Sequence, residues 1–428
     1  MKSETLPGDR HAVVRTPDRA LRLLMYANDA YGLGHLRRSV AIAGHLARAI
    51  PGLSTLLVTG SPAAHHFTLP PRVDYVKLPS VIKTGEDQYR ARDLDLPPGV
   101  ITGLRTAIIG EIAAQLAPDV VLVDHLPLGI KGELLPALRH LRHAAPWTRL
   151  VMGLRDIVDE PQKVRRKWTA DGVYAAMEEF YDRVLVYGQA DIFDPVQAYA
   201  FPPSLAARTR FCGYIRREEP VRSALDLRTE LDLGDAPFVL VAAGGGADGA
   251  GLEEAFLDAL AYLDRGHAFQ AVVITGPLMA PEERARLEAR CHGGSAVRVL
   301  QFHPDVPGLM RASSLVVAMG GYNTLCEIVA AGRPAVIVPR TRPRLEQHLR
   351  AQAFAARGLV EMVPADEVTP ARLAAAIEQA LRHAAGPRPA PADAPWDGNG
   401  LPRIAAEIAH LLPATRSARR VAAIRAPA

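Results

Sequence analysis

The residue with the clearest chemical potential near the start of the chain is a histidine in a glycine-containing loop. The loop spans 28–38 and includes Gly32, Gly34, His35 and Arg37, at a point where a strand is expected to pass into a helix. A histidine held at the start of a helix can take a proton from a hydroxyl group at neutral pH. The loop is not a dinucleotide fingerprint, because Arg37 stands where GxGxxG requires its third glycine. A turn with a histidine of no chemical role is the alternative interpretation.

A second loop has the composition of an anion-binding site. The expected strand 238–243 runs directly into Gly244, Gly245 and Gly246, and a helix is expected from residue 252. Backbone N–H groups and the helix dipole would both face a ligand such as a phosphate. The loop lacks the Gly-Lys-Ser/Thr sequence of a P-loop, so ATP hydrolysis is not indicated. A flexible glycine turn without a ligand is the alternative.

A third loop combines a glycine pair with polar side chains at helical spacing. Glu327 follows one turn after Thr324, and the loop begins with Gly320, Gly321, Tyr322 and Asn323. The glycines open a helix N-terminus toward a phosphate, and the Glu327 carboxylate can accept two hydrogen bonds from a ribose diol. Further along, Glu346 and Gln347 open another helix and can bind sugar hydroxyls in the same way. A helix cap and a buried glutamate would be the ordinary explanation, but it leaves the combination of residues unexplained.

Short β-branched runs that alternate with amphipathic segments of helical length are expected to position these loops. This alternation predicts an α/β fold with parallel sheets covered by helices on both faces, and ligands of such sheets bind beyond the carboxyl ends of the strands. The expected strands are 21–27, 55–60, 75–79, 120–124, 150–155 and 184–188, followed by 238–243, 271–276, 297–302, 315–319, 335–339 and 359–363. The expected helices include 36–50, 101–116, 131–143, 163–181, 252–263, 282–290, 324–331, 346–357 and 403–412.

The strands fall into two α/β halves of similar size. We expect a flexible leader at 1–20, an acceptor-side Rossmann-like domain at 21–215 and a charged interdomain linker at 216–236. A nucleotide-sugar-binding Rossmann-like domain is expected at 237–385. The remainder divides into a Pro/Ala/Gly-rich link with a last helix at 386–412 and a basic tail at 413–428. The last helix either returns to the first domain or forms a frayed end.

Composition narrows the class of protein. The 428 residues are 49% hydrophobic and 22% charged, as in globular proteins, and no run of about 18 apolar residues indicates a transmembrane helix. The net charge of +4 is small and lies in the C-terminal tail, so we expect no nucleic-acid partner and at most peripheral membrane contact. Three scattered cysteines predict neither a disulfide framework nor a metal site. With no signal-peptide pattern in 1–20, a cytoplasmic protein is expected.

The third loop carries a family resemblance. The run 320–347 resembles the donor-binding segment of GT-B glycosyltransferases, whose pattern is GGxNT/S-x-x-E, then G-x-P, then P, then D/E-Q. The Gly-x-Gly-His loop resembles the acceptor side of the peptidoglycan GlcNAc transferase (MurG-like) type, whose C-terminal domain is of glycosyltransferase family 28. Resemblance covers most of 21–385 and is strongest to a bacterial group of uncharacterised glycosyltransferases. It implies two Rossmann-like domains that face each other across a cleft.

The resemblance also implies roles for individual residues. Glu327 would hold the ribose of a nucleotide, and the 302–303 loop, Phe302 and His303, would hold the base, uracil in this family. Arg216 would reach the donor from the interdomain segment, whereas His35 would lie near the acceptor. The diphosphate would be lined by Gly245, Gly246, Gly320, Gly321, Asn323 and Thr324, and the donor sugar would be faced by Glu346 and Gln347.

The implied reaction is a single displacement at the anomeric carbon with inversion, without a metal or cofactor and with a UDP-sugar as substrate. His35 is the expected base, and Asp124, which ends a strand, would either orient His35 or replace it. Arg155 and Asp156 end another strand on the acceptor side, where a salt bridge between them is the alternative. Acceptor-side residues would then be Gly32, Gly34, Arg37, Arg155 and Asp156.

Two further patterns leave alternatives open. Arg340, Arg342 and Arg344 would bind donor phosphates or an anionic acceptor, or form a solvated basic loop. Asp93-Leu94-Asp95 spells the metal-binding DxD of another glycosyltransferase fold, but it lies in a proline-flanked stretch with no strand before it, so we interpret it as chance or as part of an acceptor loop at 83–98.

A nucleotide-sugar glycosyltransferase is the leading hypothesis, and its acceptor is a sugar, a lipid-linked compound or a small metabolite. A non-hydrolysing UDP-sugar 2-epimerase would use the same nucleotide pocket without an acceptor. A non-catalytic nucleotide-sugar-binding protein is the third possibility. Release of UDP separates the first hypothesis from the second, and binding without turnover identifies the third.

Overall fold

The structure is a computed structural model. The predicted basic tail at 413–428 and all but the last residue of the predicted leader lie outside the described residues. Within the described part, no helix is long and apolar enough to cross a membrane. The described residues are 20–27, 34–85, 88–218, 222–263, 270–291, 296–384 and 396–412.

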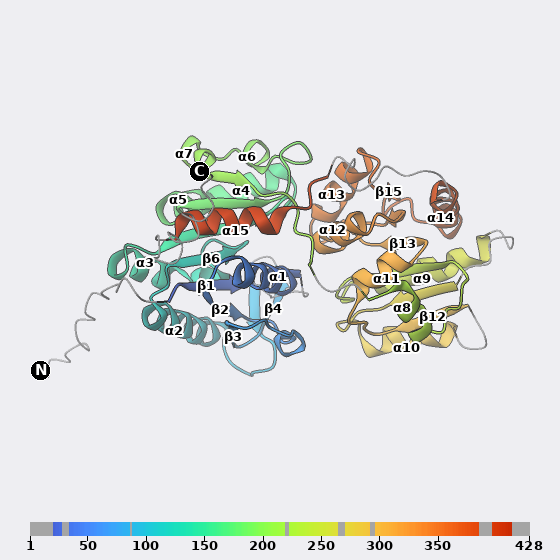
Figure 1. Ribbon diagram of the computed structural model, residues 1–428, viewed down its shortest axis with the longest axis horizontal. Coiled ribbons are helices and arrows are strands. Elements are labelled where there is room, and N and C mark those ends of the chain that lie inside the picture. The colour runs from blue at the N-terminus through green and yellow to red at the C-terminus, as the bar shows by residue number, and fades with distance from the viewer. Residues whose placement is uncertain are drawn as a thin grey trace, which may run out of the picture.

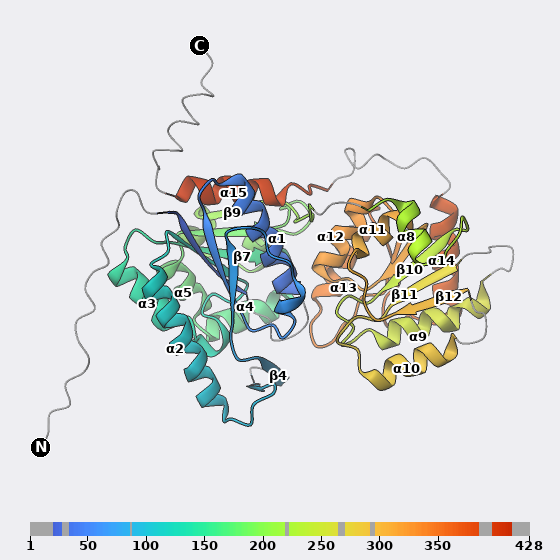
Figure 2. The same ribbon diagram turned by 60° about the horizontal axis from the view of Figure 1, so that its bottom comes forward.

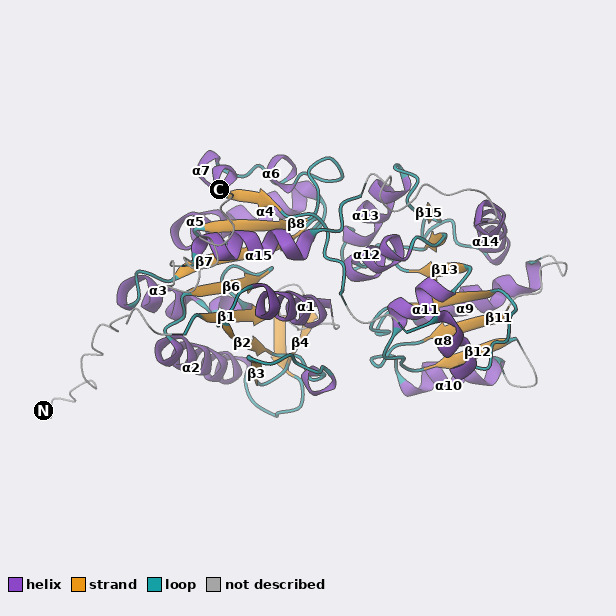
Figure 3. Cartoon of the chain, in the orientation of Figure 1, coloured by secondary structure: helices purple, strands orange, loops and turns teal. Residues whose placement is uncertain are grey.

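A seven-stranded parallel sheet forms the core of the N-terminal domain. Its central strands are apolar runs, rich in Val and Leu, that are buried on both faces, as expected for a parallel sheet covered by helices. The strand order is β3-β2-β1-β6-β7-β8-β9 (Figure 3). The strands are β1 (Arg22–Ala27), β2 (Ser54–Thr59), β3 (Val73–Lys77), β6 (Val120–Asp124), β7 (Arg149–Arg155), β8 (Arg183–Tyr187) and β9 (Thr209–Phe211).

Helices connect these strands, and one of them departs from the predicted pattern. The expected helix 163–181 is two helices, because Gly172 adopts a left-handed conformation (φ 65°) that ends the first helix and precedes the second. The helices are α1 (Gly34–Ala49), α2 (Pro98–Leu116), α3 (Leu135–Ala144), α4 (Pro161–Ala170), α5 (Val173–Phe180), α6 (Pro195–Ala198) and α7 (Pro203–Ala207).

A second parallel sheet of six strands forms the core of the C-terminal domain, in the order β12-β11-β10-β13-β14-β15. The two parallel sheets confirm the predicted α/β class. The strands are β10 (Phe238–Ala242), β11 (Gln270–Ile274), β12 (Val297–Leu300), β13 (Leu315–Ala318), β14 (Ala335–Ile337) and β15 (Glu361–Met362). The helices are α8 (Ala224–Glu230), α9 (Ala250–Ala259), α10 (Pro281–Arg290), α11 (Val306–Ala312), α12 (Tyr322–Ala331), α13 (Glu346–Ala355) and α14 (Pro370–Ala384).

Two elements lie where the sequence pattern indicates loops. The expected acceptor loop 83–98 overlaps an antiparallel hairpin of β4 (Val81–Gly85) and β5 (Gln88–Ala91), which extends from the N-terminal domain (Figure 2). Likewise, the expected linker 216–236 contains α8, which packs against α11 of the C-terminal domain. Both elements are too short to show a clear periodicity in the sequence.

The chain passes between the domains twice, and the two passages run side by side. Tyr214 donates its backbone N–H to Asp397, and Ile215 forms an antiparallel bridge with Asn399. After the second passage, α15 (Gly400–Leu411) packs against α1 in the N-terminal domain, where its position is clear in Figures 1 and 2. The C-terminal helix therefore belongs structurally to the first domain.

Candidate functional site

The N-terminal domain places a hydrogen-bonded histidine and aspartate at the carboxyl edge of its sheet. His35 lies in the first turn of α1, and its Nδ1 is 2.5 Å from Oδ2 of Asp124, the last residue of β6. Arg38, one turn after His35, donates to both oxygens of Asp124 at 2.9 and 2.7 Å. Its guanidinium also lies over the rings of Tyr187 and Tyr322, at 5.7 and 5.4 Å from their centres. This arrangement holds the aspartate and the imidazole in one orientation.

Asp124 is ionised at neutral pH. Burial opposes its ionisation, but the charges of Arg38 and His35 outweigh burial and lower the pKa of Asp124 to about 2. An ionised carboxylate can only accept, so its 2.5 Å contact favours the His35 tautomer with the proton on Nδ1, although Nη2 of Arg38 also lies 2.9 Å from that nitrogen. Nε2 of His35 is then the nitrogen that can take up a proton.

His125 lies beside this pair as a second, neutral imidazole. Its ring centre is 5.3 Å from that of His35, and its backbone is left-handed (φ 71°) directly after β6. Burial, followed by the charges of Arg155 and His35, lowers the pKa of His125 well below the ordinary value. The sequence offered no argument for a chemical role of His125, and it contributes a polar, uncharged wall next to His35.

The C-terminal domain carries a pocket at the carboxyl edge of its own sheet. Its polar lining includes Gly244, Thr324 and Glu327, and Arg37 of α1 reaches into it from the other domain. An adjoining smaller hollow shares Arg37 and Glu327 and adds Asn323. The apolar part of the pocket is lined by Ala242, Ile274, Pro277, Phe302, Val306 and Met310. The pocket thus combines an apolar wall with a carboxylate and an arginine, the polarity contrast that a nucleoside, with its flat base and polar ribose, requires.

The two glycine loops of this domain are held by close backbone packing. Gly246 has φ 90°, and a Cβ atom there would lie 2.0 Å from the carbonyl oxygen of Thr275. Similarly, a Cβ atom on Gly320 would lie 2.6 Å from the carbonyl oxygen of Gln347. Of the first loop, Gly244 rather than Gly245 or Gly246 lines the pocket. Gly321 caps α12, so the free N–H groups of that helix begin at the pocket edge.

Several predicted donor residues lie elsewhere than expected. Arg216 is exposed, whereas its neighbour Arg217 places Nη1 3.4 Å from Oε1 of Glu327. His303 is buried, and its Nδ1 accepts the backbone N–H of Asp305, so only Phe302 of that loop lines the pocket. The arginine that contacts Glu327 is therefore Arg217, the residue after the Arg216 to which the resemblance gives the donor contact.

The residues predicted for the acceptor side also lie in different parts of the structure. Gly32 lies outside the described residues, and the carbonyl of Gly34 accepts the side-chain N–H of Asn323 across the cleft at 2.9 Å. Asp156 is fully buried and pairs with Arg350 of the C-terminal domain. Arg37 lines the pocket of the C-terminal domain.

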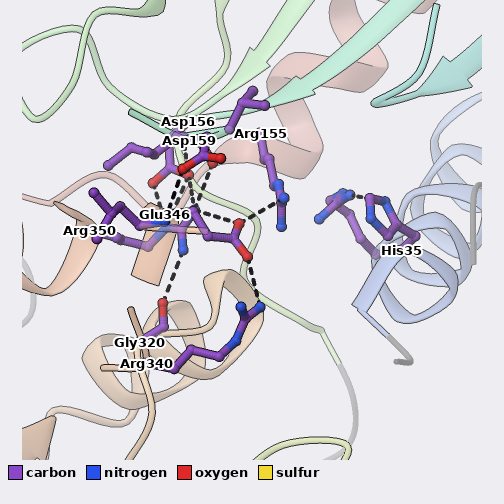
Figure 4. A network of polar contacts seen from close by, with 12 residues as sticks. His35, Arg155, Asp156, Asp159, Gly320, Arg340, Glu346 and Arg350 are labelled. Carbon is purple, nitrogen blue, oxygen red and sulfur yellow. Dashed lines mark hydrogen bonds and ion pairs between the residues drawn. The ribbon is translucent and has the colours of Figure 1, made fainter. Parts of the chain in front are cut away.

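Charged side chains join the two domains in the network of Figure 4. Glu346 at the start of α13 lies 2.7 Å from Arg155 at the end of β7 and 3.2 Å from Arg340. Burial opposes the ionisation of Glu346, but Arg155 and Arg350 overcome it and lower the pKa of the carboxyl. Burial also opposes the ionisation of Arg155, and for this basic group the effect is a lower pKa, of about 10. In this closed arrangement Glu346 contacts the opposite domain.

Of the remaining candidates, Arg340 pairs with Asp248 at 2.8 Å as well as with Glu346, so it connects the loop after β10 to the start of α13. Gln347 is buried, and its Oε1 lies 3.4 Å from the backbone N–H of Arg340. Asp93 and Asp95 are exposed in the stretch after β5. Among the described residues, no three His, Cys, Asp or Glu side chains gather as a metal site would require.

Sequence reasoning missed Arg38, Arg217 and Arg350. Arg38 had a usable signal, since a residue three positions after His35 lies on the same helix face. Arg350 had the corresponding spacing from Glu346, but its partner Asp156 comes from the other domain, and no spacing along the chain indicates that contact.

Comparison with known proteins supports the interpretation of the second half. The model of the glycosyltransferase family 28 C-terminal domain matches residues 238–407. The UDP-N-acetylglucosamine–N-acetylmuramyl-(pentapeptide) pyrophosphoryl-undecaprenol N-acetylglucosamine transferase of Methylobacterium nodulans is 32% identical over 181 residues, which are 42% of this chain and 48% of that protein. The chain thus spans less than half the length of the first curated relatives it matches.

Solved structures of the same architecture match nearly the whole chain. Acinetobacter baumannii MurG aligns over 91% of this chain and 99% of its own, with a TM-score of 0.55 and 16% identity. A putative UDP-N-acetylglucosamine 2-epimerase from Listeria monocytogenes aligns over 91% of this chain and 96% of its own, with a TM-score of 0.60 and 13% identity. The predicted fold of two Rossmann-like domains is confirmed. The chain has the GT-B fold of two Rossmann-like domains, and its residues 238–407 match the model of the glycosyltransferase family 28 C-terminal domain.

Proposed function

We propose that the protein transfers a sugar from a nucleotide-diphosphate donor to an acceptor hydroxyl, with inversion at the anomeric carbon. The observation that carries this proposal is the pairing of His35 with Asp124 at one sheet edge, opposite the start of α12 in the other domain. A base and an anion-binding helix terminus that face each other across a domain boundary suit a displacement reaction with a diphosphate leaving group.

The donor would bind in the pocket of the C-terminal domain. Glu327 would accept the ribose hydroxyls, and the apolar slot with Phe302 would take a base, for which uracil is our choice. The N-termini of α1 and α12 approach each other where Asn323 meets Gly34, so two positive helix ends converge on the expected position of the diphosphate. A UDP-hexose or UDP-N-acetylhexosamine donor agrees with the UDP-N-acetylglucosamine in the name of the Methylobacterium relative.

In the proposed step, the acceptor oxygen forms a bond to the anomeric carbon as the bond from that carbon to the phosphate oxygen breaks. The acceptor proton passes to Nε2 of His35, while Asp124 stabilises the imidazolium that forms. Negative charge grows on the departing nucleoside diphosphate. We propose that the α12 N-terminus and Arg37 or Arg217 offset this charge without a divalent metal. The acceptor is a sugar, a lipid-linked compound or a small metabolite.

A UDP-sugar 2-epimerase is the second candidate, because the Listeria epimerase aligns over nearly the whole chain. Such an enzyme would convert the donor sugar to its isomer and needs no acceptor. Incubation with UDP-N-acetylglucosamine alone separates the two reactions, since epimerisation yields an isomerised UDP-sugar, whereas transfer releases UDP only when an acceptor is present.

Calorimetric titration with UDP, GDP and TDP tests the donor assignment. We expect selective UDP binding by the wild type and at least about tenfold weaker binding by Glu327→Gln, because the amide is a poorer acceptor for the ribose hydroxyls. Glu282→Gln, at an exposed position on α10, is the matched control and should bind as the wild type does. Equal UDP affinity in Glu327→Gln and wild type would contradict the assignment.

His35→Ala tests the proposed base. The variant should keep the UDP affinity of the wild type but lose about 10²- to 10⁴-fold in transfer rate, the usual contribution of a general base. UDP release from a UDP-sugar in the presence of an acceptor mixture measures the rate. Transfer at the wild-type rate would exclude His35 as the base and leave Asp124 in that role.

A further inference from the structure

One buried arginine joins the N-terminal domain to the loop that begins α12. Arg350 of α13 is fully buried, and its Nε and Nη2 donate to Asp156 of the N-terminal domain at 2.9 to 3.1 Å. Its Nη1 donates to the carbonyl oxygen of Gly320 at 3.0 Å, and its Nη2 also donates to the carbonyl of Ile157 at 3.1 Å. Figure 4 shows Arg350 between Asp156 and Gly320.

The contact with Gly320 controls the direction of a backbone N–H group. The Gly320 carbonyl and the Gly321 N–H belong to one peptide group, and in a trans peptide they point in opposite directions. A guanidinium that holds the carbonyl therefore turns the N–H of Gly321, the cap of α12, away from Arg350. Since the backbone of Gln347 leaves no room for a Cβ atom on Gly320, the loop has little freedom to turn otherwise.

The arginine itself is held in place by a charge from the other domain. Asp156 and Arg350 are both inaccessible to solvent, and a buried charge that loses its partner is strongly destabilised. Glu346 is more distant, at 4.0 Å. Separation of the domains would remove Asp156 and leave the charge of Arg350 unpaired. The guanidinium would then be more stable when hydrated, so it would turn toward water and release the Gly320 carbonyl. The geometry of the loop then depends on domain closure.

We propose that Arg350 and Asp156 are positioning residues through which docking of the N-terminal domain orients the donor-phosphate loop at 320–322. The inference rests on the proposed function, because it assigns this loop to the donor diphosphate. It adds that the donor site is complete only when the domains are closed. By thermodynamic linkage, a nucleotide diphosphate must then favour closure to the same extent that closure favours its binding.

The test compares Asp156→Asn and Arg350→Lys with the wild type in two measurements. The first is hydrogen exchange of the backbone amides in 320–327 in the ligand-free protein. We expect at least about fivefold faster exchange in both variants, because the loop loses its anchor. The second is UDP affinity by calorimetry, which we expect to fall at least about tenfold, while domain cores exchange as in the wild type.

Asp182→Asn is the matched control. Asp182 also pairs with an arginine, Arg142 at 3.1 Å, but it precedes β8 at the opposite end of the N-terminal sheet. This control should leave both measurements unchanged. Unaltered exchange of 320–327 in Asp156→Asn and Arg350→Lys would overturn the inference, whatever the nucleotide affinity. If the wild type binds no UDP, the proposed function fails, and the exchange measurement alone still decides whether the pair positions the loop.

Discussion

At the scale of single residues, Asp124 is the charge on which the proposed base depends. It is shared between Arg38, which keeps it ionised at neutral pH, and His35, which it orients. The two partners differ in their chemistry. The guanidinium of Arg38 cannot lose its proton, so only the imidazole of His35 can exchange a proton with a substrate. Asp124 is therefore better suited to support a base than to act as one.

The low pKa of Asp124 predicts how stability changes in acid. A carboxyl group with a pKa of about 2 in the folded state and an ordinary value of 3.8 stabilises the fold above pH 4, and this stabilisation disappears as the pH falls toward 2. The pH-dependent part is about 2 kcal/mol. Urea unfolding of the wild type and Asp124→Asn between pH 6 and pH 2 should show a stability difference that shrinks in acid. A constant difference would contradict the ion pair.

At the scale of elements, the central parallel strands were predictable because they are continuous apolar runs with a loop of glycines or polar residues after them, whereas the short edge strand β9, Thr-Arg-Phe, was not predicted. Strand β6, Val-Val-Leu-Val-Asp, is an example, and its last residue is the predicted Asp124. The local sequence pattern did not predict the break between α4 and α5, which depends on the single residue Gly172. It also did not predict β4 and β5, because these strands are too short to show a periodicity.

The candidate site follows the same rule. Residues next to each other in a loop or on one helix face, such as His35 and Arg38 or Thr324 and Glu327, were accessible to sequence reasoning. Contacts across the domain boundary were not, because the pairing of Asp156 with Arg350 depends on how two independent sheets dock. The sequence thus indicated which loops meet a ligand but not which charges hold the domains together.

The loop after β10 allows a prediction about backbone shape. Gly246→Ala should lower the free energy of unfolding by about 2 kcal/mol or more, because its Cβ atom would lie 2.0 Å from the Thr275 carbonyl oxygen at a φ of 90°. Gly103→Ala, at an exposed position inside α2 with open space around it, should raise that free energy by about 0.5–1 kcal/mol. Thermal and urea unfolding measure both. A stable Gly246→Ala variant would show that the loop can rearrange.

At the scale of the whole molecule, the domains are linked by two crossing segments and by buried charge rather than by a single hinge. The bridge between Ile215 and Asn399 ties the crossings to each other, and Tyr214 stacks on Trp396 beside it at 6.0 Å between ring centres. Relative motion of the domains must therefore bend both interdomain segments together. This favours a defined path of opening and closing over free rotation.

The return of α15 predicts that damage at the C-terminus destabilises the N-terminal domain. Ile404 is fully buried in the same core cluster as Ile42 and Leu46 of α1. Ile404→Ala should lower the unfolding free energy by about 2–5 kcal/mol. Hydrogen exchange should assign the loss to the N-terminal sheet, and His410→Ala, at an exposed position of α15, should have no effect. Loss of protection confined to the C-terminal sheet would contradict this.

The same helix has a consequence for how the protein is made. A ribosome synthesises the N-terminal domain before the C-terminal one, but the apolar face of α1 that α15 covers lacks this partner until α15 leaves the exit tunnel. Of the two domains, the one that is translated first is therefore completed last. A nascent chain of this protein would expose that face throughout synthesis of the other domain, which makes it a natural point of contact for chaperones.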